Sequence, residues 1–457
     1  MPESKLKEVK MDKLVIMANQ AICKTEPMPF LKKALTYSEE VYIKRPKRAI
    51  IKRVEKTMMT PLGTFPTGLL PMVEKFLTET ERPYTVVWES LRECNATREP
   101  KLDNIVFTPE QKQVIELTIQ KKRGVIEAPT GLGKTVIAAG IISAYPEAKV
   151  LFLCHTLSLI SQTEKAFNKY NIGTVSTVSS EGKSHKGQVV ISTVHSMFRQ
   201  TAKFLSQFDI IIVDECHHIS DTRGMYAKCL VKCDAPIRIG LSATIPKSGK
   251  GKMVLEGWLG PQIDKITMRH AIEAEYLATP KLRIIKLPVD RALSYKSWKT
   301  VMDKGIIHNS RKNNRIARYV REYVENGKSV LIYVQRIEHG EVLLKMISQE
   351  VPVKFIRGIS TMEDREIARE LLNEKKIPCI IATTVWKEGV NIPTLDVLIN
   401  AAEGKSERAI IQTIGRGLRR TKDKLEVTII DFFDPSNHIL VSHFGERLCL
   451  YMDMGWI

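Results

Sequence analysis

The chain has 457 residues, of which 43% are hydrophobic and 26% are charged, the composition of an ordinary globular protein. It carries 70 lysines and arginines against 51 acidic residues, a formal net charge of +19. This excess indicates a polyanionic partner. Nucleic acid is favoured over a membrane because no apolar run approaches the ~18 residues of a spanning helix. The N-terminus lacks the apolar core of a signal peptide, so we expect a cytoplasmic protein.

The eight cysteines are spread along the chain, which at this length indicates reduced thiols and not a disulfide framework. Only Cys229 and Cys233 lie close together in the sequence. A zinc site made of these two cysteines with Cys216 and His217 is an alternative, which the irregular spacing disfavours.

Residues 1–100 carry 18 lysines and arginines against 13 acidic residues, and seven of these cations fall within residues 41–56. They alternate with β-branched and aromatic residues, and Pro46 interrupts any helix, so we expect a basic strand pair. Such a pair can grip a DNA duplex, or it can be a solvated edge whose charges prevent aggregation. Residues 69–78 predict an amphipathic helix. The candidate DNA-binding residues of the strand pair are Lys44, Arg45, Lys47, Arg48, Lys52 and Arg53.

From about residue 105 onward, short apolar runs alternate with polar loops and helical patterns. Such runs are typical of buried parallel strands, so the predicted fold class is α/β with two parallel-sheet domains. A stretch near residues 245–300 separates the two sets of strands. The predicted strands are 124–127, 149–154, 188–192, 209–214 and 238–242 in the first domain, and 329–334, 353–356, 379–383, 397–400 and 426–431 in the second.

Residues 128–135 read APTGLGKT and lie between a predicted strand and a predicted helix, the setting of a phosphate-binding loop. Thr130, Gly131 and Gly133 would bring backbone groups close to the phosphates of ATP. Lys134 would reach the β- and γ-phosphates, and the Thr135 hydroxyl would hold Mg²⁺. The alternative is an ordinary glycine-rich turn between a strand and a helix.

Asp214 and Glu215 directly follow the apolar run 210–213 and begin the sequence DECHH. At the end of a strand beside a phosphate loop, Asp214 can hold Mg²⁺ and Glu215 can polarise the attacking water. The alternative is a pair of acids that caps the next helix.

These motifs, in this order, resemble those of the superfamily-2 helicases over about residues 105–435. DECHH, in place of DEAD, speaks against the large RNA-helicase group. The pattern is most similar to the phage UvsW-type branch-migrating helicases, and more loosely to the XPB and RecG groups. The further motifs are LSAT at 241–244, ATTVWKEGVNIP at 382–393 and QTIGRGLRR at 412–420.

The resemblance implies two RecA-like motor domains, and it also implies roles for individual residues. Gln111 would read adenine, although Thr108 and Glu110 depart from the residues usual in the group. Gly389 would contact the nucleotide, and Ser242 and Thr244 would couple nucleotide state to domain geometry. Gln412 would bind the γ-phosphate or the water, and Arg416 and Arg419 would act as arginine fingers, unless they form a solvated basic helix. The motif residues expected to contact DNA are His155, Thr193 and Thr383.

We therefore expect an ATP- and Mg²⁺-dependent DNA helicase or translocase. It would act as a monomer on branched DNA with single-stranded portions, such as forks, Holliday junctions and displacement loops, in replication, recombination or repair. Its location would be the host cytoplasm if a phage encodes it.

An RNA helicase is the alternative. A degenerate, non-enzymatic motor is disfavoured because all the expected catalytic residues are present, and a restriction-enzyme motor subunit is disfavoured because no nuclease motif is visible.

The expected organisation has four parts, and every ATPase motif begins after Phe107. We therefore expect the two motor domains to fold without the N-terminal domain. The parts are a small α+β DNA-binding domain (1–100), the ATP-binding RecA-like domain (101–260), a connecting segment (261–300) and a second RecA-like domain with a C-terminal helix (301–457).

Overall fold

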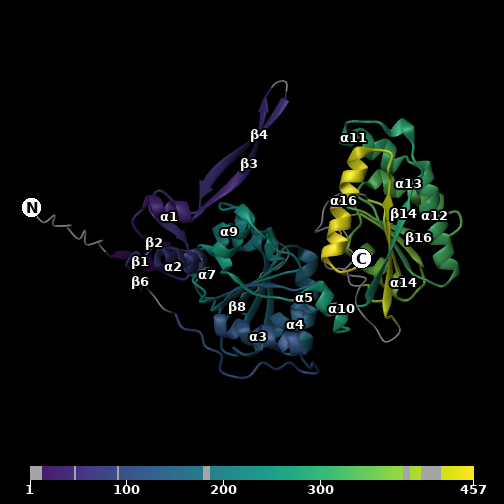
Figure 1. The fold of residues 1–457 in the computed structure, drawn as a ribbon. Coiled ribbons are helices and arrows are strands. Elements are labelled where there is room, and N and C mark those ends of the chain that lie inside the picture. The colour runs from purple at the N-terminus through teal and green to yellow at the C-terminus, as the bar shows by residue number, and fades with distance from the viewer. Residues whose placement is uncertain (1–12, 46–47, 90–91, 179–185, 384–391, 403–423) are drawn as a thin grey trace, which may run out of the picture. The chain divides into compact units, whose positions relative to one another are not determined.

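Figure 1 shows the computed structural model of the chain. It describes residues 13–45, 48–89, 92–178, 186–383, 392–402 and 424–457, without the side chains of residues 42–51 and 362. Contacts divide the chain into two compact units: residues up to 127 with 134–265, and residues 128–133 with 266–457. Each unit contains one large parallel sheet, so the predicted α/β class is confirmed. No helix in the described residues is long and apolar enough to cross a membrane.

The first unit begins with a small α+β domain whose four strands form a mixed sheet in the order β5-β2-β1-β6. The helix predicted at 69–78 is present as α2, which has a proline in its first turn and buries Leu70, Val73 and Leu77 on one face. The elements are β1 (Leu14–Ala18), β2 (Ile22–Lys24), α1 (Pro29–Ala34), β5 (Thr64–Pro66), η1 (Thr67–Leu69), α2 (Leu70–Glu79) and β6 (Tyr84–Trp88).

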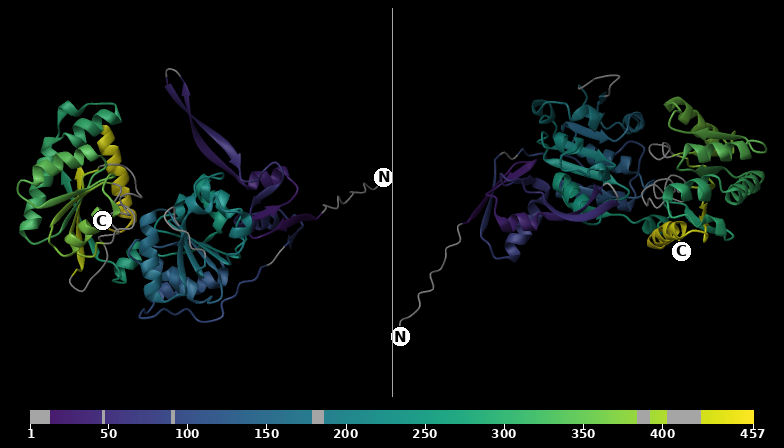
Figure 2. Two further views of the ribbon diagram at one scale, coloured as in Figure 1. Left: turned by 180° about the vertical axis from the view of Figure 1, so that it is seen from behind. Right: turned by 90° about the horizontal axis from the view of Figure 1, so that it is seen from above.

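The predicted basic strand pair is present as β3 (Thr36–Arg45) and β4 (Arg48–Thr57), which form a separate antiparallel arm. The arm extends away from the four-stranded sheet, as Figure 1 and the left view of Figure 2 show. Successive residues of a strand point to opposite faces. The neighbouring cations Lys52 and Arg53 therefore lie on different faces of the arm.

The N-terminal domain packs on α9 (Gly249–Leu259), a helix of the following α/β domain, and the two domains share one hydrophobic core. Their backbones approach so closely that a Cβ atom on Gly68 would lie 2.0 Å from the carbonyl oxygen of Glu256. Phe65 and Trp258 are buried in this shared core. Removal of residues 1–100 would expose it to water, which argues against the expectation that the motor domains fold alone.

The large sheet of the first unit has seven parallel strands in the order β13-β7-β12-β11-β8-β10-β9. All residues of β8 and β12 are buried, which explains the continuous apolar sequence of β8, whereas β12 also buries Arg238 and Ser242. All five strands predicted for this domain are present, whereas the edge strands β9 and β13 are additional. The strands are β7 (Arg123–Glu127), β8 (Val150–Cys154), β9 (Val175–Val178), β10 (Val189–Thr193), β11 (Ile210–Asp214), β12 (Ile237–Ser242) and β13 (Gln262–Lys265).

The helices of this domain connect its parallel strands in sequence order. They are α3 (Pro109–Lys121), α4 (Lys134–Ser143), α5 (Leu157–Tyr170), α6 (Val194–Met197), α7 (Ala202–Leu205), η2 (Cys216–His218), α8 (Met225–Leu230) and α9.

The sheet of the second unit has six parallel strands in the order β14-β19-β18-β15-β17-β16. All five predicted strands are present, and β14 (Thr279–Lys286) is added at one edge. The other strands are β15 (Val330–Tyr333), β16 (Val353–Ile356), β17 (Cys379–Ala382), β18 (Val397–Asn400) and β19 (Glu426–Phe433). The helices are α10 (Met268–Glu273), η3 (Arg291–Leu293), α11 (Trp298–Val301), η4 (Met302–Ile307), α12 (Ser310–Glu325), α13 (Ile337–Ile347), α14 (Met362–Asn373) and α16 (His438–Asp453).

The C-terminal helix α16 is fixed to β19 by a buried polar network. Arg447 Nε lies 2.7 Å from Asp431 Oδ2, and the Tyr451 hydroxyl donates to the same oxygen at 2.8 Å. Because such a pair is costly to break once buried, it holds the helix in one position.

The predicted division into four parts stays a prediction. Within the predicted connecting segment, residues 261–300, strand β13 joins the sheet of the first unit and β14 joins the sheet of the second. All eight cysteines are free thiols. Burial raises the pKa of Cys229 to about 12, so this thiol stays protonated at neutral pH. In the described part of the chain, Cys216, His217, Cys229 and Cys233 do not bring their ligand atoms together as a zinc site would require.

Candidate functional site

Residues 128–133 connect β7 to α4, the position that the sequence predicts for a phosphate-binding loop. Gly131 and Gly133 have φ angles of 97° and 88°, in the left-handed region where a side chain would be strained. Helix α4 begins at Lys134, so Lys134 and Thr135 occupy its first turn. The unbonded N–H groups of a first helical turn favour anions, and the loop therefore has the backbone of a phosphate site.

The register of the sheet brings three sequence motifs to one edge. Strand β12 lies between β7 and β11, with Ser242 paired to Glu127 and Leu241 paired to Asp214. Because the three strands are parallel, their carboxyl ends meet at the same edge, where α/β proteins bind their ligands.

Glu215 lies at the centre of a partly buried network at this edge. Its Oε1 atom is 4.0 Å from Lys134 Nζ, and its Oε2 atom is 3.3 Å from His217 Nδ1. His217 Nδ1 also lies 2.9 Å from Ser242 Oγ. The Lys134 and Glu215 side chains are only 12% and 15% exposed, so their charges are screened less than they would be in water. The phosphate loop, DECHH and LSAT motifs are thus joined through side-chain contacts.

The backbone at Glu215 departs from the ordinary strand conformation. Its φ angle is +48°, which costs a residue with a side chain about 1–2 kcal/mol. Its N–H donates to Asp214 Oδ1 at 3.0 Å, which fixes the turn. Strained residues of this kind concentrate at active sites, and here the strain turns Glu215 out of the strand direction.

The residues predicted to hold Mg²⁺ have suitable chemistry. A Thr135 hydroxyl and an Asp214 carboxylate are oxygen donors of the kind that Mg²⁺ takes together with phosphate oxygens and water. The hydroxyl of Thr244, in the same unit, is buried and has no hydrogen-bond partner among the described residues. The donor set and this hydroxyl fit a bound nucleotide with its metal ion.

Ser242, one of the two predicted coupling residues, organises the turn after β12. Its hydroxyl donates to the Thr244 carbonyl at 2.8 Å and accepts from the Thr244 N–H at 3.3 Å. The same hydroxyl contacts His217, so the turn that holds Thr244 is connected to the DECHH motif.

His155, predicted to contact DNA, packs against the DECHH motif. Its ring stacks on that of His218, with centroids 3.5 Å apart and planes 3° apart. The His218 ring in turn lies 4.3 Å from the His217 ring. The sequence analysis missed this contact, because it depends on β8 and β11 being neighbours in the sheet.

Gln111, predicted to read adenine, caps helix α3. Its side-chain oxygen accepts from the Thr108 N–H at 3.1 Å, and its own N–H donates to the Thr108 hydroxyl at 3.3 Å. This capping box satisfies two N–H groups at the helix start. The sequence signal for this box is Thr108 followed three residues later by glutamine. The adenine role stays a prediction.

Thr193 and Thr383, also predicted to contact DNA, lie at the carboxyl ends of β10 and β17. Thr193 caps α6 by accepting from the Ser196 N–H at 3.4 Å, and the Thr383 N–H donates to the Ile356 carbonyl at 3.1 Å. Each is 5% exposed, so only a small part of either residue can reach a DNA strand.

Several predicted residues cannot be placed. Gly389, Gln412, Arg416, Arg419 and Lys47 lie outside the described residues, as do the side chains of Lys44, Arg45 and Arg48. Lys52 and Arg53 are described, and both are exposed.

Two parallel α/β domains, the first with a phosphate loop and a strand-end acidic pair, define a class of nucleotide-driven motors with RecA-like folds. Two family models match the chain: "Type III restriction enzyme, res subunit" over residues 104–247 and "Helicase conserved C-terminal domain" over residues 311–421. The chain belongs to the superfamily-2 helicases and is an ATP-dependent helicase.

Named relatives agree with this assignment. The chain is 25% identical over 345 residues to the ATP-dependent DNA helicase uvsW of Enterobacteria phage T4, covering 71% of this chain and 68% of that protein. It is 25% identical over 362 residues to the DNA 3'-5' translocase XPB2 of Sulfurisphaera tokodaii, covering 70% and 80%. The DNA-bound helicase MrfA shares the fold with a TM-score of 0.58 at 16% identity, covering 78% of this chain and 55% of that chain.

Proposed function

We propose that this helicase is a DNA translocase that remodels branched DNA, such as forks, Holliday junctions and displacement loops. The observation that carries the proposal is the basic β3–β4 arm, which belongs to a domain packed firmly on the first motor domain. A motor that follows one DNA arm needs a second contact, at a fixed place, to sense a branch. The relatives named for action on DNA favour DNA over RNA.

The ATP-hydrolysing step rests on the network around Glu215. Lys134 stabilises charge on the β- and γ-phosphates, and Glu215 orients and polarises the attacking water. Thr135 and Asp214 would hold Mg²⁺, which would neutralise phosphate charge. Lys134 would contact the phosphates of a bound nucleotide, and the contact of Glu215 with His217 does not depend on Lys134.

The arm is anchored by one acidic residue at its base. Glu39 Oε1 lies 2.8 Å from Lys250 Nζ of α9, and Glu39 Oε2 lies 2.7 Å from Lys56 Nζ of β4. The two lysines lower the pKa of Glu39 to about 2, so the carboxylate is charged throughout the physiological range. Glu39 thereby joins both strands of the arm to the motor domain.

The test compares ATP hydrolysis stimulated by a forked DNA, a linear duplex of equal length, single-stranded DNA and an RNA duplex. We expect the forked DNA to reach half-maximal stimulation of ATP hydrolysis at a lower concentration than the other nucleic acids. The RNA duplex should stimulate hydrolysis only weakly. Lys134→Ala should hydrolyse no ATP on any of them and still bind the fork, because binding uses other cations. Equal or stronger stimulation by the RNA duplex would favour the alternative, an RNA helicase.

A further inference from the structure

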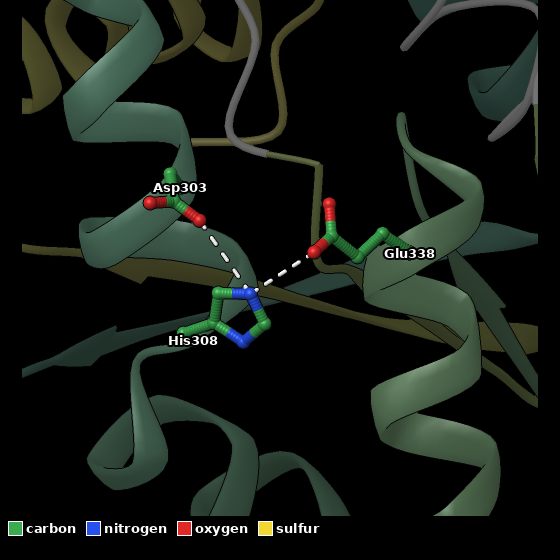
Figure 3. Close-up of side chains that lie close together, drawn as sticks. All are labelled: Asp303, His308 and Glu338. Carbon is green, nitrogen blue, oxygen red and sulfur yellow. Dashed lines mark hydrogen bonds and ion pairs between the residues drawn. The ribbon is translucent and has the colours of Figure 1, made fainter.

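Three metal-ligating side chains of the second unit, remote in sequence from the ATPase motifs, point toward one another. Figure 3 shows the His308 ring between the carboxylates of Asp303 and Glu338. His308 Nε2 lies 3.5 Å from Asp303 Oδ1 and 3.1 Å from Glu338 Oε1. It is the only group of three such ligand atoms within 4.8 Å of one another in the described part of the chain.

Asp303 and His308 are brought together by an unusual turn. Residues 302–307 form the π-helix η4, and the His308 N–H donates to the Asp303 carbonyl at 2.8 Å. This bond spans five residues and places positions 303 and 308 one above the other, whereas in an α-helix they would point in different directions. π-Helical turns are rare in proteins overall, and those that occur are often found at functional sites.

Glu338 is held in register with His308 by a buried relay. The Asn313 amide donates to the carbonyl of Ile307, next to His308, at 2.8 Å. The Asn313 side-chain oxygen lies 3.0 Å from Nε2 of His339, next to Glu338. Asn313 and His339 are each 1% exposed, so the relay is shielded from water. The fold therefore sets the relative backbone positions of His308 and Glu338, whose side chains are 48% and 62% exposed.

We propose that Asp303, His308 and Glu338 form a binding site for a divalent transition-metal ion, of which Zn²⁺ fits best. One imidazole nitrogen with two carboxylate oxygens is a donor set for zinc and its neighbours, whereas Mg²⁺ and Ca²⁺ prefer oxygen alone. Ligands about 2.0–2.1 Å from zinc in a tetrahedron lie about 3.3 Å apart, between the two distances seen here.

Two of the three residues also line a cavity. Asp303 and Glu338 both line a cavity of about 810 Å³, together with Trp298, Thr300 and Arg336. A fourth ligand, water or an anion, has access there. The ion would tie η4 to the first turn of α13, immediately after the strand-end residues 334–336.

The test uses the full-length chain, stripped of metal by a chelator and kept free of nucleotide and magnesium. Cobalt(II) is titrated while its visible absorption is recorded, and zinc is then added as competitor. We expect one equivalent of cobalt to give a visible band that zinc abolishes. His308→Ala should lose the band, and Glu338→Gln should weaken zinc binding by at least tenfold.

Matched controls are His438→Ala, an exposed histidine elsewhere in the unit, and Glu341→Gln, one turn further along α13. Both should bind cobalt as the wild type does. Asp303→Asn serves as a third, isosteric variant if His308→Ala fails to fold in a thermal melt. If the wild type binds no zinc, or if the Asp303, His308 and Glu338 variants bind as it does, the three residues form only an ion-paired cluster and the proposal is wrong.

Discussion

The ATP site and the β3–β4 arm differ in how their functional side chains are held. At the ATP site, Lys134 and Glu215 are largely buried, and Glu215 contacts both Lys134 and His217. His217 in turn contacts the Ser242 hydroxyl. On the arm, Lys52 and Arg53 are exposed, and Glu39 joins the base of the arm to the motor domain. Substitutions at the ATP site should therefore have large, non-additive effects on ATP hydrolysis. Substitutions on the arm should have small, additive and salt-dependent effects on DNA affinity.

The largest effect is expected for Glu215→Gln. The amide cannot polarise water, so ATP turnover should fall by about 10²- to 10⁴-fold while nucleotide binding persists. Steady-state hydrolysis and equilibrium binding of a fluorescent nucleotide measure the two effects. Glu147→Gln, an exposed acid of the same domain, is the control. Turnover equal to that of the wild type would remove Glu215 from the catalytic role.

A smaller effect is expected for Ser242→Ala, which removes the hydroxyl between His217 and Thr244. One net hydrogen bond corresponds to a change of about two- to tenfold, so ATP turnover should fall within that range. DNA unwinding per ATP should fall further if this contact couples the two events. Ser206→Ala, at an exposed site, should change neither rate. A normal unwinding yield per ATP would remove Ser242 from the coupling role.

The next effect concerns the anchor of the arm. Glu39→Gln removes the charge shared by Lys56 and Lys250, so the preference for forked over linear DNA should fall by a few-fold, with ATPase activity on linear DNA unchanged. Fluorescence anisotropy with both DNAs measures this preference. Glu26→Gln, at an exposed position of the same domain, is the control. An undiminished preference in Glu39→Gln would show that the anchor is unimportant.

The pKa of Glu39 also sets the pH dependence of the anchor. A lowered pKa means that the ion pairs are fully present above the ordinary glutamate range near pH 4.5, and that they are lost as the pH falls toward about 2. The contribution of Glu39 to fork preference, taken as the difference between wild type and Glu39→Gln, should therefore be constant between pH 5.5 and 8. A loss of this difference at pH 5.5 would contradict the assignment.

The smallest effect separates the two faces of the arm. Arg53 is paired across the strands with acidic Glu40, whereas Lys52 is paired with Val41. Lys52→Ala should therefore lower the slope of log affinity against log salt by ~0.9, the value for one duplex phosphate contact, and Arg53→Ala should change it less. Lys75→Ala, on α2, is the control. Equal slopes in all variants would identify the arm as a solvated edge.

Much of the fold could be predicted from the sequence because buried parallel strands are nearly continuous apolar runs, as in β8 and β11. Edge strands such as β13 and β14 are more polar and were not recognised. The packing of the N-terminal domain on α9 was also missed, because it rests on a close backbone approach at Gly68 that leaves no periodic pattern.

For the site, the sequence predicts the residues but not their contacts. The link from Lys134 through Glu215 and His217 to Ser242 depends on β12 lying between β7 and β11. These strands are far apart in the chain, and strand order is not visible in the sequence. The capping box of Gln111 depends only on residues close in sequence, Thr108 and Gln111, and the structure shows both of its hydrogen bonds.

The central claim is that an ATP-driven motor with a fixed arm moves DNA branches. It is tested most directly by following the separation of a synthetic four-way junction into duplex products in the presence of ATP. We expect the wild type to resolve the junction and Glu215→Gln to leave it intact. Lys52→Ala should be slower on the junction but normal in ATP hydrolysis on linear duplex. A wild-type chain that hydrolyses ATP on linear duplex but leaves the junction intact would contradict the central claim.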